Sequence, residues 1–282
     1  MKTGLVLEGG AMRGLYTAGV LDVFMENQIR LDGAVGVSAG AVFGCNYKSG
    51  QIGRTLRYNK KYSRDKRYMS ISSLIRTGDL FGEQFCYHDI PERLDPFDQK
   101  AYQENPMDFY VVCTDVRTGA PVYHLCNQGD AHDLKWMQAS ASMPMVSRIV
   151  EVDGYALLDG GMSDSIPVAW MRGIGYEKNV VVLTRAAGYR KKAGKLDSIL
   201  YAPLNKYPGI KRVMLHRPAM YNAQLELVEQ LANAGEILVI RPSAPITISR
   251  TERDPKKLQQ VYDLGRADAM RMLAQVKSYI CD

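Results

Sequence analysis

The sequence predicts a three-layer α/β/α fold with a mainly parallel central sheet, and two observations lead to this fold class. Two strand-turn-helix units follow each other within the first 50 residues. Further segments rich in Val, Ile and Tyr then alternate with helical segments along the rest of the chain. Parallel strands need long crossover connections, which are usually helices, so this alternation favours a parallel sheet covered on both faces.

The first two units have the same order of elements. The first begins with an apolar strand over 4–9 and passes through a glycine-rich turn into a helix over 15–27, whose apolar residues recur at helical spacing. The second begins with a short apolar strand over 34–37 and leads into a helix of small residues that Gly50 closes. Two such units in tandem indicate neighbouring parallel strands.

The later elements are predicted from β-branched and aromatic content for strands and from apolar periodicity for helices. Further strands are expected over 109–116, 121–126, 179–185 and 236–242. Further helices are expected over 133–143, 219–235 and 256–279. Residues 152–158 are expected to form a hairpin that delivers Asp159 to a glycine turn.

We expect a single domain over residues 1–282. A chain of 282 residues with 46% hydrophobic residues is long enough for one large core, and its Gly and Pro residues are not concentrated in a linker. Within this domain, the motif-bearing core covers about residues 4–168. A basic loop or lid is expected over about 186–210, and a helical C-terminal region over about 254–280.

Several classes of protein are excluded by composition. The five cysteines include no C-x-x-C pair and the four histidines have no metal-ligand spacing, so we expect no disulfide scaffold, metal or other cofactor. No apolar stretch approaches the ~18 residues that a membrane-spanning helix needs, and the first residues do not resemble a signal peptide. A cytoplasmic location follows as an expectation.

The net charge of +6 is unevenly distributed. Residues 54–67 hold seven Lys or Arg, and residues 172–217 hold eleven. These runs are either solvated faces or surfaces that hold the protein peripherally at an anionic membrane, such as the inner membrane face. In the second case, the interleaved tyrosines would sit at headgroup level. They are Tyr58, Tyr62, Tyr68, Tyr189, Tyr201 and Tyr207. No motif supports nucleic-acid binding, and we expect no such partner.

The first motif with chemical content is G-x-S-x-G, formed by Gly36, Ser38 and Gly40. It lies between a predicted strand and a predicted helix, which is the context of a nucleophile elbow. Glycine two positions either side of the serine lets strand and helix approach closely while the hydroxyl points outward. Ser38 is therefore the candidate nucleophile.

The second motif is the glycine-rich turn over 9–14, GGAMRG, between the first strand and the first helix. Its backbone N–H groups are suited to an anion, which is either a phosphate or the oxyanion of acyl transfer. The third motif is Asp159-Gly160-Gly161, in which two glycines after the acid allow another backbone to approach the carboxylate. Asp159 is the candidate base.

Together, these motifs resemble those of the patatin-like phospholipases. That family combines a G-G-[GA]-x-[RK]-G oxyanion loop, a G-x-S-x-G elbow and a D-G-[GA] motif with the dyad aspartate, and this chain has GGAMRG, GVSAG and DGG in the same order. The stretch over 139–144, ASASMP, is similar to a family segment that precedes the aspartate. The resemblance covers roughly residues 4–168.

The resemblance implies a patatin-like fold and a serine lipid acyl hydrolase with a Ser-Asp dyad and no catalytic histidine. Asp159 would accept the Ser38 proton, an acyl-serine would form, and water activated by Asp159 would hydrolyse it. The expected substrate is a lipid or other carboxylic ester, as for a phospholipase A or a lipase. The resemblance also implies an oxyanion loop of Gly9, Gly10, Ala11, Arg13 and Gly14.

Three alternatives stay open at this point. Ser38, Asp159 and His216 follow the Ser…Asp…His order of the α/β-hydrolases, which allows a histidine triad. The GGAMRG turn could belong to a nucleotide-binding module, although it lacks the G-x-G-x-x-G spacing. The third alternative is a non-catalytic lipid-binding scaffold.

Overall fold

The computed structural model describes residues 1–194 and 197–281. Within them, one sheet of eight strands has the order β5-β6-β3-β2-β1-β7-β8, with β4 also paired to β3. The mutually parallel strands are β1 (Lys2–Leu7), β2 (Gly33–Val37), β3 (Asp108–Asp115), β7 (Tyr176–Val182) and β8 (Ile237–Ile240). The antiparallel strands are β4 (Pro121–Leu125), β5 (Val150–Val152) and β6 (Tyr155–Asp159).

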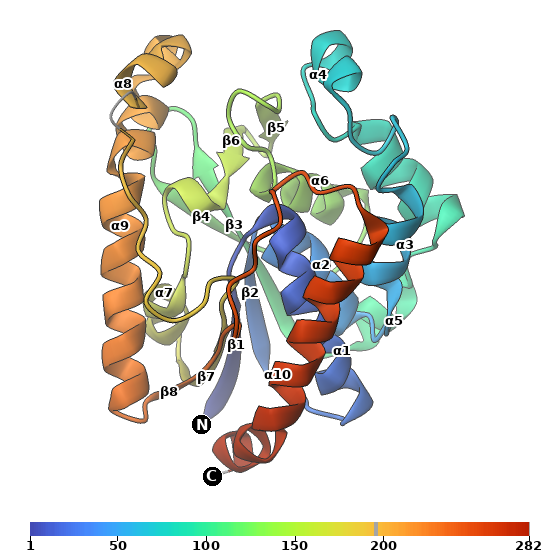
Figure 1. Ribbon diagram of the computed structural model, residues 1–282, viewed down its shortest axis with the longest axis vertical. Helices are drawn as coiled ribbons and strands as arrows, with labels where there is room; N and C mark the ends of the chain where they lie inside the picture. Colours follow the sequence, from blue (N-terminus) through green and yellow to red (C-terminus); the bar gives the residue numbers. More distant parts are fainter. Residues whose placement is uncertain (195–196, 282) are drawn as a thin grey trace.

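Helices cover both faces of this sheet (Figure 1). One face carries α1 (Leu15–Glu26), α2 (Ala39–Lys48), α6 (Ala131–Ser140) and α10 (Pro255–Cys281). The other face carries α7 (Val168–Gly173) and α9 (Pro208–Asn233). In β1, Leu5 and Leu7 pack into the first layer and Val6 into the second, and all three are fully buried. The predicted three-layer α/β/α class with a mainly parallel sheet is confirmed.

The stretch between α2 and β3 holds elements that the sequence analysis did not predict. They are α3 (Arg54–Tyr62), α4 (Ile71–Thr77), a π-helix η2 (Phe85–Leu94) and α5 (Gln99–Glu104). These helices are short, and the π-helix contains Pro91. Apolar residues at helical spacing therefore do not recur often enough in the sequence to predict a helix. Two further short helices, both 3-10 in type, are η1 (Ala11–Gly14) and η3 (Gly160–Met162).

The segment predicted as a basic loop over 186–210 differs from that expectation. Residues 195 and 196 lie outside the described residues, but the described part contains α8 (Asp197–Leu200) and the 3-10 helix η4 (Ala202–Lys206). Helix α9 also begins at Pro208 rather than at 219, and it continues through Pro218. Burial of Ile210 and Met214 offsets the cost of a proline inside the helix.

The first basic run does not form the tyrosine-bearing surface that was considered for a membrane contact. Tyr58, Tyr62 and Tyr68 are buried, with exposures of 8%, 7% and 5%. Arg54 is also buried and donates hydrogen bonds to the Asp95 carbonyl and to Asn46. The headgroup interpretation of these three tyrosines is therefore wrong, because Tyr58 and Tyr62 on α3 and Tyr68 after it pack into the core. Among the described helices, none is long and apolar enough to cross a membrane.

Candidate active site

Strand β3 brings Ser38 and Asp159 together. Its consecutive residues Val112 and Cys113 pair with Val37, at the end of β2, and with Asp159, at the end of β6. Ser38 directly follows Val37, so the two candidate residues meet at the carboxyl edge of the parallel strands, where ligands of α/β proteins bind. The pairing register thus explains why residues 121 positions apart lie side by side.

Ser38 lies on a strained turn at the start of α2. Its backbone has φ 55° and ψ −119°, a conformation that costs a non-glycine residue roughly 1–3 kcal/mol. A Cβ at Gly40 would lie 2.3 Å from the Leu7 carbonyl oxygen, and one at Gly36 would lie 2.6 Å from the Ala41 Cα. Only glycine fits at these two positions, which gives the turn the geometry of a nucleophile elbow.

The segment over 139–144 supports this turn from α6. The Ser38 N–H donates to Ser140 Oγ at 3.0 Å, and the Ser140 hydroxyl donates to the Val112 carbonyl at 2.6 Å. The Asp159 N–H donates to the Ser142 carbonyl at 2.8 Å. One short stretch therefore fixes the backbones of both candidate residues.

The glycine-rich turn lies directly against Ser38. A Cβ at Gly9 would lie 2.9 Å from both Ser38 Cβ and the Val37 carbonyl oxygen, so no larger residue fits there. Among the described residues, the N–H groups of Gly9 and Gly10 have no protein acceptor. They are available to an oxyanion beside Ser38. Ala11, with φ 49°, lines the same site. Gly14 lies farther along the turn and packs against Ala39.

Asp159 is deeply buried, with 1% of its surface exposed. Its Oδ1 accepts a hydrogen bond from the Gly161 N–H at 2.8 Å, whereas Oδ2 has no partner of good geometry in the described part of the chain. Burial raises the pKa of this carboxyl, and the Arg217 guanidinium, the Ser38 hydroxyl and the Gly161 N–H partly oppose that rise. Asp159 therefore has an oxygen without a well-formed hydrogen bond and is more basic than an ordinary aspartate.

Two cavities meet at Ser38. The first, of ≈160 Å³, is mainly apolar, and its walls include Val42, Phe43, Ile90 and Leu134. The second, of ≈360 Å³, lies over the glycine-rich turn and Asp159. In the described part of the chain, five cationic side chains line this second cavity: Arg13, Arg185, Lys191, Arg217 and Arg250. We call these side chains the cation cluster.

Only part of this cluster was predicted from the sequence to belong to the site. Arg13 was placed in the oxyanion loop, while Arg185, Lys191 and Arg217 appeared only as members of a basic run, and Arg250 was missed. Charge density in residues 172–217 was the one available signal. It did not distinguish the cavity-facing residues from exposed neighbours such as Lys192 and Arg212.

No histidine of the described residues lines either cavity. His216 precedes Arg217 on α9, but it is exposed to solvent. The geometry therefore gives no support to a triad of Ser38, Asp159 and His216.

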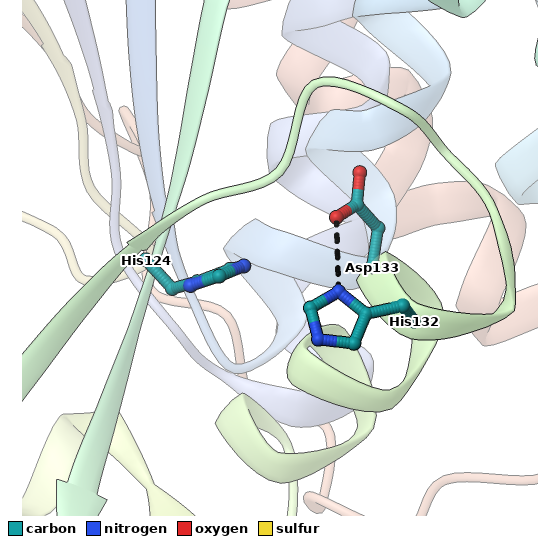
Figure 2. Close-up of side chains that lie close together, drawn as sticks. All are labelled: His124, His132 and Asp133. Atoms are coloured by element: carbon teal, nitrogen blue, oxygen red, sulfur yellow. Dashed lines mark ion pairs between the residues drawn. The ribbon is translucent and has the colours of Figure 1, made fainter. Parts of the chain in front are cut away.

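Figure 2 shows one further group, His124, His132 and Asp133, whose potential ligand atoms lie within 4.8 Å of one another. Each already has a protein partner. His124 stacks on Trp136 at 4.0 Å, His132 Nε2 meets Asp153 at 2.9 Å, and Asp133 accepts the N–H groups that precede α6. These contacts make the group a structural brace between β4 and α6.

Comparison with known proteins gives two family matches. The model of the patatin-like phospholipases matches residues 5–170, and that of a domain of unknown function (DUF6363) matches residues 207–280. The uncharacterized protein YjjU of Escherichia coli is 28% identical over 98% of this chain and 78% of its own length. The lysophospholipase nte1 of Aspergillus terreus is 26% identical over 98% of this chain, which spans 18% of that protein.

Among solved structures, VipD from Legionella pneumophila covers 99% of this chain and 67% of its own, with 13% identity and a TM-score of 0.46. The family assignment does not depend on that likeness. It rests on the first family model, which spans more than half of the 282 residues and includes Ser38 and Asp159. The chain belongs to the patatin-like phospholipase family.

Proposed function

We propose that this protein is a serine hydrolase of carboxylic esters in lipids, of the phospholipase A or lipase type, with Ser38 as nucleophile and Asp159 as base. Membership of the family supports lipid acyl hydrolysis in general. The observation that carries the specific assignment is the buried Asp159 carboxylate, whose Oδ2 lacks a partner beside the strained Ser38.

In the first half of the proposed reaction, Ser38 Oγ attacks the ester carbonyl carbon while Asp159 Oδ2 accepts the hydroxyl proton. The carbonyl oxygen becomes an oxyanion that the N–H groups of Gly9 and Gly10 stabilise. The tetrahedral intermediate then collapses, the carbon–oxygen bond to the alcohol breaks, and the protonated Asp159 gives its proton to the leaving oxygen. The products of this half are a free alcohol and an acyl-serine.

In the second half, water takes the place of the alcohol. Asp159 accepts a proton from this water as it attacks the acyl carbon, and the Ser38 oxygen leaves and recovers the proton. The free fatty acid and the original enzyme result. The raised pKa of Asp159 favours both proton transfers, because a carboxylate with an ordinary pKa near 3.9 is a weak base at neutral pH.

The apolar cavity is the proposed site of the acyl chain. Its walls are aliphatic and aromatic, and it opens at Ser38. Each methylene group buried there would contribute roughly 0.8 kcal/mol to binding. We therefore expect longer acyl chains to be preferred until the cavity is filled.

The first test is covalent labelling and turnover of matched variants. We expect a fluorophosphonate to label Ser38, and we expect Ser38→Ala and Asp159→Asn to lose about 10³-fold or more in kcat while staying folded. Ser72→Ala and Asp153→Asn, which change residues outside both cavities, are the controls. Labelling of another residue, or full turnover by Asp159→Asn, would contradict the assignment.

We also propose that α4 contacts the lipid surface. Ile71 and Ile75 on this helix are 71% and 82% exposed, which is unfavourable for two isoleucines without a partner. The chain after α4 leads to Leu80 and Phe81, which line the cavities. A lipid that contacts α4 would therefore lie near the entrance to Ser38.

A further inference from the structure

In the described lining of the second cavity, cationic side chains outnumber carboxyl groups. Among the described residues, two carboxyl groups line this cavity, Asp159 and Glu8. Glu8 is already occupied by neutral donors, because it accepts hydrogen bonds from the Thr184 N–H and from the Tyr221 hydroxyl, both at 2.6 Å. The cavity wall therefore carries an excess of positive charge beside the candidate nucleophile.

The cluster members also differ from nearby arginines in their partners. Arg190 and Arg241 both pair with Glu229, at 2.8 and 3.7 Å. Within the described ranges, no member of the cluster forms an ion pair or a side-chain hydrogen bond to protein. The Nε atoms of Arg13 and Arg217 are buried and unpartnered, and Arg13 is only 8% exposed.

Aromatic rings hold two of the cations in place without neutralising them. The Arg185 guanidinium lies 4.3 Å from the centroid of Tyr189, and the Lys191 ammonium lies 4.2 Å from that of Tyr221. Burial and mutual repulsion lower the pKa values of two of these cations. Burial, together with Arg185 and Arg250, lowers the pKa of Arg13 to about 10, and burial with Arg217 and other cations lowers the pKa of Lys191 to about 7. An anion in the cavity would relieve this repulsion.

Most of the cluster comes from the part of the chain beyond the patatin-like match. Arg185 and Lys191 follow β7, whereas Arg217 on α9 and Arg250 before α10 lie inside the DUF6363 match over 207–280. The Met12 N–H donates to the Arg250 carbonyl, which ties this C-terminal segment to the glycine-rich turn. The C-terminal segment therefore forms one wall of the active-site cavity.

We propose that the cation cluster binds a phosphomonoester dianion on the substrate, and that the C-terminal segment thereby selects lipids with such a headgroup. This proposal rests on the function proposed above. The two cavities meet at Ser38 and share Phe81, Met143 and Val146, so the acyl chain and the headgroup would lie on opposite sides of the ester. A choline headgroup, with its fixed positive charge, would be repelled from the same cavity.

Binding to the Ser38→Ala protein tests this specificity without relying on turnover. Calorimetry would compare four probes: a short-chain 1-acyl-glycerol 3-phosphate, the phosphocholine lipid with the same acyl chain, glycerol 3-phosphate and inorganic phosphate. We expect the phosphomonoester lipid to bind about tenfold or more tightly than the phosphocholine lipid, because charge-assisted hydrogen bonds to a buried anion are worth that much or more. Equal affinity for the two lipids would overturn the proposal.

Adjacent lysines provide a matched pair of variants. Lys191→Gln removes a cation that faces the cavity, whereas Lys192→Gln removes an exposed one outside it. We expect Lys191→Gln, and likewise Arg250→Gln, to weaken binding of the phosphomonoester lipid about tenfold and to leave binding of the phosphocholine lipid unchanged. Lys192→Gln should change neither. An equal loss of affinity in both lysine variants would mean that binding depends on the net charge of the protein, and it would overturn the proposed site.

Glycerol 3-phosphate and inorganic phosphate distinguish two possible ligands of the cluster, a lipid headgroup and free phosphate. If the headgroup site serves a lipid, inorganic phosphate and glycerol 3-phosphate should bind far more weakly than the acylated probe. If inorganic phosphate binds as tightly as the lipid, the cluster binds free phosphate and the lipid specificity is wrong. All of these experiments measure binding and not hydrolysis. If the native protein hydrolyses no ester but the headgroup selectivity is observed, only the proposed catalytic function is refuted.

Discussion

Replacing Arg217 by Gln should move the acid limb of kcat/KM to higher pH. Asp159 must be deprotonated to accept the Ser38 proton, so activity falls as the pH drops through its pKa. Burial raises that pKa, and the positive charge of Arg217 opposes the rise. Without the charge the pKa rises further, and the enzyme loses activity at a higher pH than the native protein does.

The magnitude follows from the position of the two groups. A Cβ at Gly161 would lie 3.0 Å from Asp159 Oδ1 and 3.2 Å from Arg217 Nη2. The charges are thus separated by no more than about 6 Å, and at an effective dielectric constant of ~20 their attraction is roughly 2–3 kcal/mol. One pKa unit corresponds to ~1.4 kcal/mol, so we expect a shift of about one to two pH units.

The assay is the pH profile of a small neutral ester, which has no headgroup for the cation cluster to bind. Arg212→Gln is the matched control, because Arg212 lies on the same helix but is exposed outside the cavity. We expect its profile to overlay the native one. An acid limb that stays in place in Arg217→Gln, or that moves equally in both variants, would refute Asp159 as the titrating base.

Three further predictions concern the histidines, the glycine-rich turn and the lipid surface. Gln substitution of any one histidine should leave the acid limb of kcat/KM unchanged, because no described histidine lines the cavities. A shift of that limb in His216→Gln would instead support a triad of Ser38, Asp159 and His216. Gly9→Ala should lower kcat for the neutral ester about 10²-fold while the protein stays folded, since its Cβ would displace the turn from Ser38. An unchanged kcat would exclude the turn from oxyanion binding. Vesicle sedimentation should show binding that increases with anionic lipid and weakens with salt, as expected for charges screened over about 8 Å at physiological ionic strength. Ile75→Glu should weaken that binding, whereas Ile174→Glu, which changes an exposed residue just before the start of β7, should not. Salt-insensitive binding to neutral vesicles would exclude the electrostatic contribution.

Local sequence patterns are sufficient to predict the fold class and most of the sheet. Each of the six single strands predicted overlaps an observed one, and the hairpin before Asp159 is β5 and β6. These elements are local in origin: buried parallel strands are short continuous apolar runs, and the glycines at 36 and 40 mark a turn that only glycine can form. The same local pattern nominated Ser38 and Asp159 as candidates.

Only the tertiary structure decided what surrounds those two residues. Register on β3 set Ser38 against Asp159, and packing of α9 brought Arg217 beside the carboxylate. In the sequence, Lys191 and Lys192 are equivalent members of a basic run, yet one lines the cavity and the other is exposed. Which way a charged side chain faces depends on contacts between distant segments, and these contacts cannot be predicted from composition. For the same reason Arg250, which lies outside both basic runs in the loop before α10, became part of the site only once the chain had folded.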